Sequence, residues 1–258
     1  MSVMVFDIET VPDVAGGRRL YGLDGLDDAG VAKAMAQLKL QKSGTEFLAH
    51  HLQRVVAISI AFRSRDSFRI WSLGDLDAGE AELIERFFDG VERYSPTLVS
   101  WNGSGFDLPV LHYRGLLSGV VAARYWEVGD DDKGFRYNNY LGRFHWRHVD
   151  LMDVLAAYQI RAAAPLDEIA TLLGFPGKMG MSGAKVWDAF QGGDIAGIRN
   201  YCETDVLNTY LVYLRFQRMR GHLSDEGYLE ECALVRDVLA GSQAPHLAEF
   251  LAAWPDGA

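Results

Sequence analysis

Short runs of apolar residues predict the strands of a sheet. Five strands are expected, at residues 3–10, 54–62, 68–73, 97–101 and 148–151. β-Branched and aromatic residues dominate these runs, as is typical of strands. The second and third runs are separated by a polar segment of hairpin length, residues 63–67, so we expect them to pair antiparallel.

Apolar residues at three- and four-residue steps predict helices between and after these strands. Helices are expected at residues 31–40, 80–94, 109–117, 152–160, 166–173 and 194–220, with two more within 224–254. The longest is expected to begin at an Asp194 N-cap and to end at Gly221. Its predicted buried stripe is Ile195, Ile198, Cys202, Val206, Thr209, Tyr213 and Phe216. The rest of residues 11–51 is expected to be a long loop around one helix.

The order strand, hairpin, helix, strand, helix is typical of an α/β protein with a mixed sheet flanked by helices. We expect one domain over residues 1–258, with a core at 3–220 and a C-terminal helical extension at 221–258. Residues 120–147 are expected to be an irregular, aromatic-rich insertion. Sheets of this kind bind ligands at the carboxyl ends of their strands.

The aromatic residues of the insertion are interleaved with cations, namely Lys133, Arg136, Arg143 and Arg147. Aromatic rings among cations provide stacking platforms for single-stranded nucleic acid, at roughly 1–3 kcal/mol per stacked base. The alternative is an aromatic lid that covers the sheet. The sequence favours neither interpretation.

Composition narrows the possible functions. The formal net charge of −10 argues against broad attraction to nucleic acid through a basic surface, but bound ions and a local basic patch are still able to recruit a phosphate backbone. We expect a cytoplasmic protein without a membrane partner, because no apolar run approaches the eighteen or so residues of a membrane helix. The two cysteines, Cys202 and Cys232, lack metal-type spacing, and no phosphate-loop motif is present, so neither zinc nor a nucleotide cofactor is expected.

Two acids end the first predicted strand. Asp7 and Glu9 are two residues apart, so an extended backbone points both side chains to one face. Two buried carboxylates repel each other unless a cation lies between them, and oxygen ligands suit Mg²⁺ or Mn²⁺. The alternative is that the strand ends at Phe6 and both acids are solvated.

A third acid follows the fourth predicted strand. The segment Asn102-Gly103-Ser104-Gly105-Phe106-Asp107 forms a glycine-rich turn that places Asp107 at a helix start, beside the end of a strand. An N-cap is the alternative role for Asp107. Asn102 and Phe106 also have structural alternatives, as a turn residue and a core residue.

The remaining candidates lie later in the chain. Tyr201 and Asp205 are four apart on the face of the long helix next to its buried stripe, and a structural pair at the rim of the core is the alternative. Asp150 is a candidate support for a metal site, and Asp153 is expected to be a helix-start acid. Adjacent His50 and His51 do not converge on one metal, so we expect structural roles for both.

Three motifs in this order resemble those of the DEDDy 3′–5′ exonucleases, in particular the proofreading exonuclease domain of family B DNA polymerases and related stand-alone proteins. The motifs are Asp7-Ile8-Glu9, Asn102-Gly103-Ser104-Gly105-Phe106-Asp107 and Tyr201-Cys202-Glu203-Thr204-Asp205. The resemblance spans residues 3–220. No polymerase domain follows before Ala258, so we expect a stand-alone enzyme.

The resemblance implies an RNase H-like sheet and two-metal hydrolysis, with Mg²⁺ or Mn²⁺, at the 3′ end of single-stranded nucleic acid, DNA more readily than RNA. Asp7 would bridge both ions, Glu9 and Asp205 would hold the ion that activates water, and Asp107 would support the leaving-group ion. Tyr201 would orient the water, because its ordinary pKa of about 10 makes it a poor base. The candidates for holding the terminal nucleotides are Thr10, Asn102, Phe106 and Lys185. Two alternatives stay open: a catalytically silent nucleic-acid-binding module and an RNase H-type endonuclease.

Overall fold

A computed structural model describes residues 2–255 and has one five-stranded sheet at its centre, in the order β3-β2-β1-β4-β5. The strands are β1 (Val3–Pro12), β2 (Gln53–Arg63), β3 (Phe68–Ser72), β4 (Thr97–Ser100) and β5 (His148–Asp150). β2 pairs antiparallel with β1 and β3, whereas β4 pairs parallel with β1 and β5. The sheet is therefore mixed, and the α/β, RNase H-like fold expected from the sequence is confirmed.

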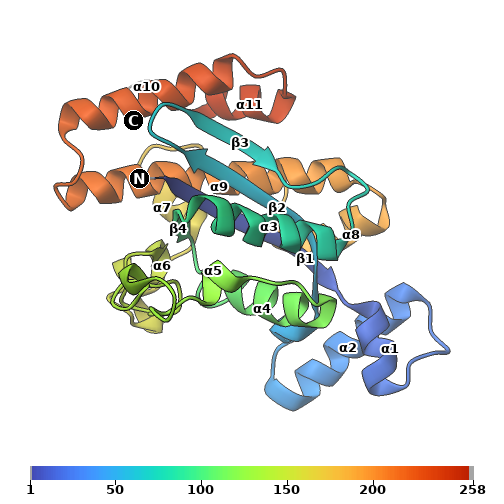
Figure 1. The fold of residues 1–258 in the computed structure, drawn as a ribbon. Coiled ribbons are helices and arrows are strands. Elements are labelled where there is room, and N and C mark those ends of the chain that lie inside the picture. Colours follow the sequence, from blue (N-terminus) through green and yellow to red (C-terminus); the bar gives the residue numbers. More distant parts are fainter. Residues whose placement is uncertain (1, 256–258) are drawn as a thin grey trace.

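Helices cover both faces of the sheet (Figure 1). They are α1 (Val14–Tyr21), α2 (Asp28–Ser43), α3 (Glu80–Tyr94), α4 (Asp107–Ser118), α5 (Ala123–Trp126), α6 (Leu151–Leu155), α7 (Leu166–Leu172), α8 (Val186–Gln191), α9 (Ile195–Met219), α10 (Asp225–Ala240) and α11 (Pro245–Ala253). Residues alternate between the faces along β1. Val5 packs in a core with α9 and α10, and Phe6 packs in a second core with α3 and α4.

The long helix α9 has the predicted ends. The Asp194 side chain accepts a hydrogen bond from the Gly197 amide, and Gly221 ends the helix with a φ of 71°. The predicted stripe is buried except for Ile195, which is half-buried. The C-terminal half of α9 is buried on further faces too, because α10 and α11 pack against it.

The prediction for residues 11–51 was wrong in one respect, because the segment contains two helices rather than one. β1 continues to Pro12, and α1 begins at an Asp13 N-cap whose side chain accepts from the Gly16 amide. Glycines in α1 lower helix propensity and led us to expect a loop. Gly17 is needed in this helix because the space that a Cβ would occupy holds the Met35 side chain of α2.

The predicted helix at residues 152–160 is also shorter than expected. α6 ends at Leu155, and both Ala157 (φ 49°) and Tyr158 (φ 62°) adopt left-handed backbone conformations that end the helix. The Arg143 guanidinium holds this turn, because it donates to the Tyr158 carbonyl at 3.4 Å and lies 5.4 Å from the centre of the Tyr158 ring.

The insertion at residues 120–147 is partly a lid. Tyr125, Phe135 and Tyr140 are buried against the core of α3 and α4. Arg124 and Arg147 stack on Phe135, at 4.2 and 3.8 Å from its centre, so these cations stabilise the lid. The outer aromatic residues, Trp126, Tyr137, Phe144 and Trp146, stay exposed. In residues 2–255, no helix has the length and hydropathy needed to cross a membrane.

Candidate active site

The acidic end of β1 faces α9. Val5 packs against α9, and the strand alternation places Asp7 and Glu9 on that same face. The pairing of β1 with β2 shifts register after Glu9, between this residue and Thr10. Such bulges are common beside active sites, where they redirect side chains. The strand therefore does not end at Phe6, and the first alternative for these acids is wrong.

A buried ion network holds this end of the sheet. Arg114 of α4 pairs with Asp13 and Glu80, each at 2.6 Å. Glu80 also accepts a hydrogen bond, at 2.7 Å, from the backbone amide of Val55, which lies just beyond the register shift that follows Glu9. The network thus stabilises the irregular backbone opposite the acids.

Asp107 reaches the same end of β1 from the turn after β4. Its carboxylate accepts a hydrogen bond from the Ile8 amide at 3.2 Å. The N-cap residue of α4 is Phe106, whose side chain makes no capping bond, so the N-cap alternative for Asp107 is wrong. β4 pairs with β1 only at residues 3–5, and the Asp107 carboxylate contacts β1 where that pairing has ended.

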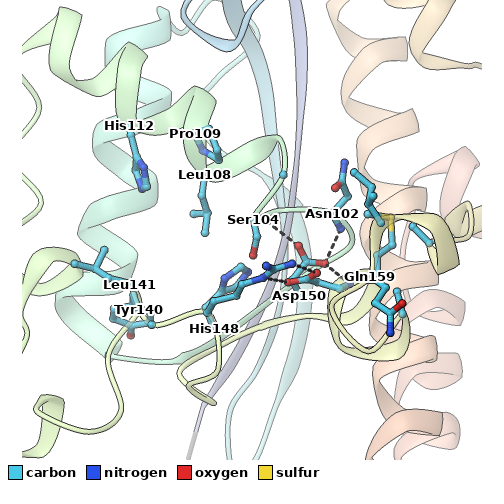
Figure 2. A pocket seen from close by; sticks show the side chains of 18 of the residues that line it. Asn102, Ser104, Leu108, Pro109, His112, Tyr140, Leu141, His148, Asp150 and Gln159 are labelled. Carbon is cyan, nitrogen blue, oxygen red and sulfur yellow. Dashed lines mark hydrogen bonds and ion pairs between the residues drawn. The ribbon is translucent and has the colours of Figure 1, made fainter.

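Asp150 at the end of β5 fixes the turn that carries Asp107. Its carboxylate accepts from the backbone amides of Asn102 at 2.9 Å and Ser104 at 2.8 Å (Figure 2). Asn102 has a φ of 64°, a conformation that the two hydrogen bonds help to hold. Asp153 lies in the first turn of α6, as predicted, and pairs with Arg143 at 2.7 Å.

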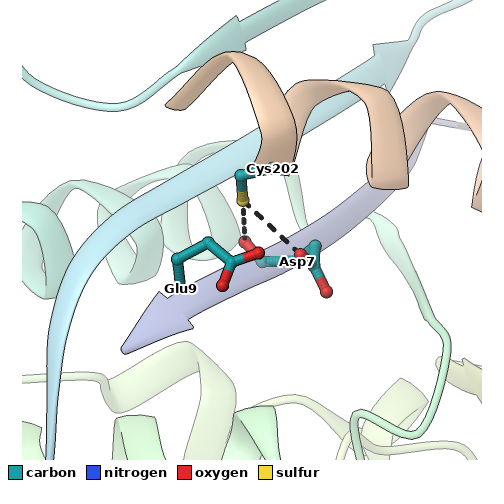
Figure 3. A group of neighbouring side chains, drawn as sticks. All are labelled: Asp7, Glu9 and Cys202. Atoms are coloured by element: carbon teal, nitrogen blue, oxygen red, sulfur yellow. Dashed lines mark hydrogen bonds between the residues drawn. The ribbon is translucent and has the colours of Figure 1, made fainter. Parts of the chain in front are cut away.

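The long helix α9 contributes the third motif. Asp205 is close enough to Asp7 and Glu9 to raise the pKa of both, and hydrogen bonding to Tyr201 lowers the pKa of Asp205. The Cys202 Sγ lies 3.5 Å from Asp7 Oδ2 (Figure 3). The structure therefore brings together all four acids and the tyrosine that the sequence singled out.

Burial raises the pKa of every carboxyl in this group, and repulsion by the other members raises those of Asp7 and Glu9 further. For Asp7 the pKa is well above its ordinary value, first because of burial and then because of Asp107, Glu9 and Asp205. Burial likewise raises the pKa of Asp107 to about 7 and that of Asp205 to about 6. Four carboxyls that resist ionisation as a group create a strong demand for positive charge.

The donor set fits hard divalent ions. Single ligand atoms of Asp7, Glu9 and Cys202 lie within 4.8 Å of one another, the one such group of three found among residues 2–255. The Glu9 side chain is 8% exposed, and none of the hydrogen bonds or ion pairs in that range involves its carboxylate. Carboxylate oxygens suit Mg²⁺ and Mn²⁺, and the Asp107 and Asp205 carboxyls beside the group add further oxygen ligands of the same kind.

A groove of about 970 Å³ lies between Glu9 and α2. Glu9 lies in its wall together with three of the predicted substrate residues, Thr10, Asn102 and Phe106. Phe47 and Trp187 also line the groove, although neither was predicted from the sequence. The rings of Phe47 and Phe106 are 5.6 Å apart, and His50 lies 5.7 Å from Phe106, so His50 supports the aromatic wall.

A second pocket, of about 400 Å³, lies on the other side of the turn (Figure 2). It shares Asn102 and Gly105 with the groove, and its other walls include Asp150, His148 and Gln159. The turn at residues 102–105 therefore separates two hollows and contributes to both.

Lys178 is the lysine whose charge acts on the acids, whereas Lys185 was the lysine predicted from the sequence. Lys178 lowers the pKa of both Glu9 and Asp205. Lys185 is exposed and follows Gly183 and Ala184, which line the groove. The sequence signal that could have pointed to Lys178 is Asn208, a polar residue one turn after Asp205.

The Asn208 side chain clamps the loop that carries Lys178. It accepts from the Gly177 amide at 3.1 Å and donates to the Gly177 carbonyl at 2.8 Å. Asn208 is only 1% exposed, so these bonds lie in the core of the protein. A buried amide with both ends satisfied on one backbone residue holds the loop rigidly against α9.

Residues 45–254 match the model of a protein family described as a predicted 3′–5′ exonuclease related to the exonuclease domain of PolB. The matched range contains Asp107, Tyr201 and Asp205 and begins after β1. Among curated proteins, none matches this chain.

Proposed function

The chain belongs to this family of predicted 3′–5′ exonucleases, and we propose that it hydrolyses single-stranded nucleic acid from the 3′ end, DNA more readily than RNA, with two Mg²⁺ or Mn²⁺ ions. The observation that carries the proposal is the convergence of Asp7, Glu9, Asp107 and Asp205, which come from three distant segments, beside a groove whose wall includes Glu9. Buried acids with raised pKa values in a hollow are typical of functional sites.

The four acids would hold the ions, with Asp7 between them, Glu9 and Asp205 on the side of the attacking water, and Asp107 on the side of the leaving group. Divalent ions supply Lewis-acid activation of water and neutralise charge on phosphate oxygens. In the reaction, water loses a proton as its oxygen bonds to phosphorus, the bond from phosphorus to the O3′ of the preceding nucleotide breaks, and that oxygen takes up a proton. The products are a 5′-mononucleotide and a shortened strand with a 3′ hydroxyl.

Tyr201 would orient the water as a hydrogen-bond donor. Burial raises its pKa, with further increases from Asp205, Glu9 and Asp7, so its hydroxyl keeps its proton at neutral pH. A protonated phenol donates to an oxygen and does not act as a base. Lys178 would add positive charge beside Glu9 and Asp205, where the substrate phosphate approaches.

The groove would hold the last nucleotides. Phe47, Phe106 and Trp187 offer ring faces for bases, and Thr10 and Asn102 offer polar groups close to Glu9. Glu9 would accept a hydrogen bond from the terminal 3′ hydroxyl. Lys185 remains a proposed contact for the backbone at the edge of the groove. We also infer that residues 3–220 and the extension 221–258 work as one exonuclease domain, which the packing of α10 and α11 on α9 supports.

The direct test is degradation of matched single strands of DNA and RNA carrying a 5′ label, with free or blocked 3′ ends, beside a closed circle. We expect successive shortening of the free-ended DNA that requires Mg²⁺ or Mn²⁺, slower shortening of RNA, and protection of blocked and circular substrates. Asp205→Ala should abolish the shortening and keep the wild-type circular dichroism spectrum. Cleavage of the circle would favour an endonuclease, and equal activity of wild type and Asp205→Ala would overturn the proposed site.

A further inference from the structure

A row of polar side chains crosses the otherwise apolar face of the sheet under α9. Ser59 of β2 lies directly opposite Asp7 of β1, and Ser72 of β3 lies directly opposite Ser59. The two hydroxyl oxygens are 2.9 Å apart and buried, at 0% and 6% exposure. Their strand neighbours on this face, such as Ala57 and Ala61, are apolar, so the row is a local departure from the core pattern.

The row continues into the helices. The Ser72 hydroxyl donates to Glu203 Oε1 at 2.7 Å, and His246 Nε2 lies 2.7 Å from Glu203 Oε2. Glu203 belongs to α9, and His246 belongs to α11 in the C-terminal extension. The side chains of both are mostly buried, at 12% and 15% exposure. We call Ser59, Ser72, Glu203 and His246 the polar row.

Cys202 connects the polar row to Asp7. Burial raises the pKa of the Cys202 thiol, and Ser59, the strand partner of Asp7, is one of the neighbouring groups that act on it. The thiol in turn contacts both the carbonyl oxygen and Oδ2 of Asp7, at 3.4 and 3.5 Å. Figure 3 shows the thiol directed at Asp7. The polar row therefore runs from α11, through α9 and two strands, to Ser59, which lies opposite Asp7 on the neighbouring strand.

The donors and acceptors give the row a direction. The Ser72 hydroxyl donates its one proton to Glu203. Ser72 then accepts from Ser59, and the Ser59 proton points away from Asp7. His246 Nδ1 is buried without a partner in residues 2–255, and Nε2 lies at hydrogen-bond distance from Glu203, which favours a proton on Nε2 donated to that carboxylate. Glu203 thus sets the orientation of every hydroxyl in the row.

We propose that Ser72, Glu203 and His246 are positioning residues that fix the Asp7 carboxylate for metal binding, so that α11 of the C-terminal extension supports the active site from across the sheet. The inference rests on the proposed role of Asp7 as a metal ligand. Partners behind a ligand set its orientation, and their removal typically weakens metal binding about 10- to 100-fold. The acids themselves are left unchanged by substitutions in the row.

The test measures Mn²⁺ affinity by electron paramagnetic resonance of free Mn²⁺, without substrate. Ser72→Ala interrupts the row at its centre, and we expect about tenfold weaker Mn²⁺ binding. Ser72→Thr keeps the hydroxyl and should restore the affinity. The matched control is Ser67→Ala, because the Ser64 and Ser67 hydroxyls form a similar pair, 2.7 Å apart, in the turn of the same hairpin and have no link to Asp7.

Two further comparisons keep the outcomes distinct. His246→Leu, at the far end of the row, should weaken Mn²⁺ binding in the same direction, which guards against poor folding of Ser72→Ala. Wild-type affinity in His246→Leu and in a folded Ser72→Ala would overturn the inference and leave the proposed function standing. Failure of the wild-type protein to bind Mn²⁺ would instead overturn the proposed function, and the inference with it.

Discussion

The carboxylate of Asp107 accepts a hydrogen bond from the backbone amide of Ile8, which lies between Asp7 and Glu9. The contact joins residues 99 positions apart in the chain and fixes the acid of the second motif against the strand of the first. Because Asp107 is bonded to the backbone of β1, its position follows that of Asp7 and Glu9. Any change at Asp107 therefore has separate effects on backbone support and on charge.

Asp107→Asn separates these two effects. The asparagine oxygen still accepts from Ile8, but the buried charge is removed, so we expect a higher unfolding temperature than wild type at pH 8 in the presence of EDTA. Asp107→Ala loses the acceptor as well and should unfold at a lower temperature than Asp107→Asn. Both variants should lose the rise in unfolding temperature that Mn²⁺ produces in wild type. Scanning calorimetry with and without Mn²⁺ measures all three effects, and a Mn²⁺ response retained in Asp107→Asn would contradict a ligand role.

The gain from Asp107→Asn should depend on pH. Burial raises the pKa of Asp107 from 3.8 to about 7. Below about pH 3 the carboxyl is protonated in both the folded and unfolded states, so the substitution should change little. As the pH rises to 7, the unfolded state ionises first and wild type loses stability relative to the variant, by at most about 4 kcal/mol. Urea unfolding of both metal-free proteins from pH 4 to 8 measures this difference, and a gain that is constant with pH would contradict the raised pKa.

The strands and most helices follow from sequence because their apolar periodicity is local. α3 has the predicted bounds, since Leu83, Phe87, Phe88 and Val91 repeat at helical steps into one core. Predictions failed where tertiary contacts decide the backbone. Gly17 lies within a helix because Met35 fills the space above it, a contact that no local pattern reveals.

In the candidate site, too, the residues set by local spacing were predictable and those set by tertiary contacts were not. The acids were predictable because two-residue spacing on a strand and four-residue spacing on a helix fix shared faces. Cys202 was correctly predicted to be buried, but its contact with Asp7 depends on which part of α9 crosses β1. Phe47 and Lys178 were missed because each reaches the site from a loop, and their positions depend on Phe106 and on the Asn208 clamp.

The two lysines near the site provide a matched pair of variants. Both side chains are exposed, but Lys178 lowers the pKa of Glu9 and Asp205, whereas Lys185 lies beside the groove. Lys178→Met should reduce kcat/KM about tenfold, because it removes the cation next to the acids and the substrate phosphate. Lys185→Met should have the smaller effect. Steady-state kinetics on one DNA oligonucleotide measure both effects. A larger loss with Lys185→Met would show that Lys185 is the more important contact for the substrate.

The aromatic wall of the groove should act mainly on substrate binding. Phe47 is 59% exposed and its ring packs at a tilt against Phe106 at the groove, so Phe47→Ala removes a ring face with little loss of core packing. At roughly 1–3 kcal/mol per stacked base, KM for single-stranded DNA should rise at least about fivefold with little change in kcat. The control is Tyr137→Ala, an exposed ring of the insertion that does not line the groove. An equal rise in KM for Tyr137→Ala would indicate that the outer insertion also binds the strand.

Tyr201→Phe tests whether the phenol acts as a donor to the acid cluster. Hydrogen bonding from Tyr201 lowers the pKa of Asp205, which burial raises to about 6. Metal ions bind the ionised carboxylate, so Mn²⁺ affinity should rise with pH through this range in wild type. Removing the hydroxyl leaves Asp205 with a higher pKa, and the rise in affinity should move to higher pH.

The rate of nucleotide release by Tyr201→Phe should fall about tenfold to a hundredfold at neutral pH, less than for Asp205→Ala, because one hydrogen bond to a charged group is lost and the ligands remain. Mn²⁺ titrations at a series of pH values distinguish this role from a structural one. A Tyr201→Phe protein with slower release and an unchanged pH dependence of Mn²⁺ affinity would show that the phenol acts on the water alone and not through Asp205.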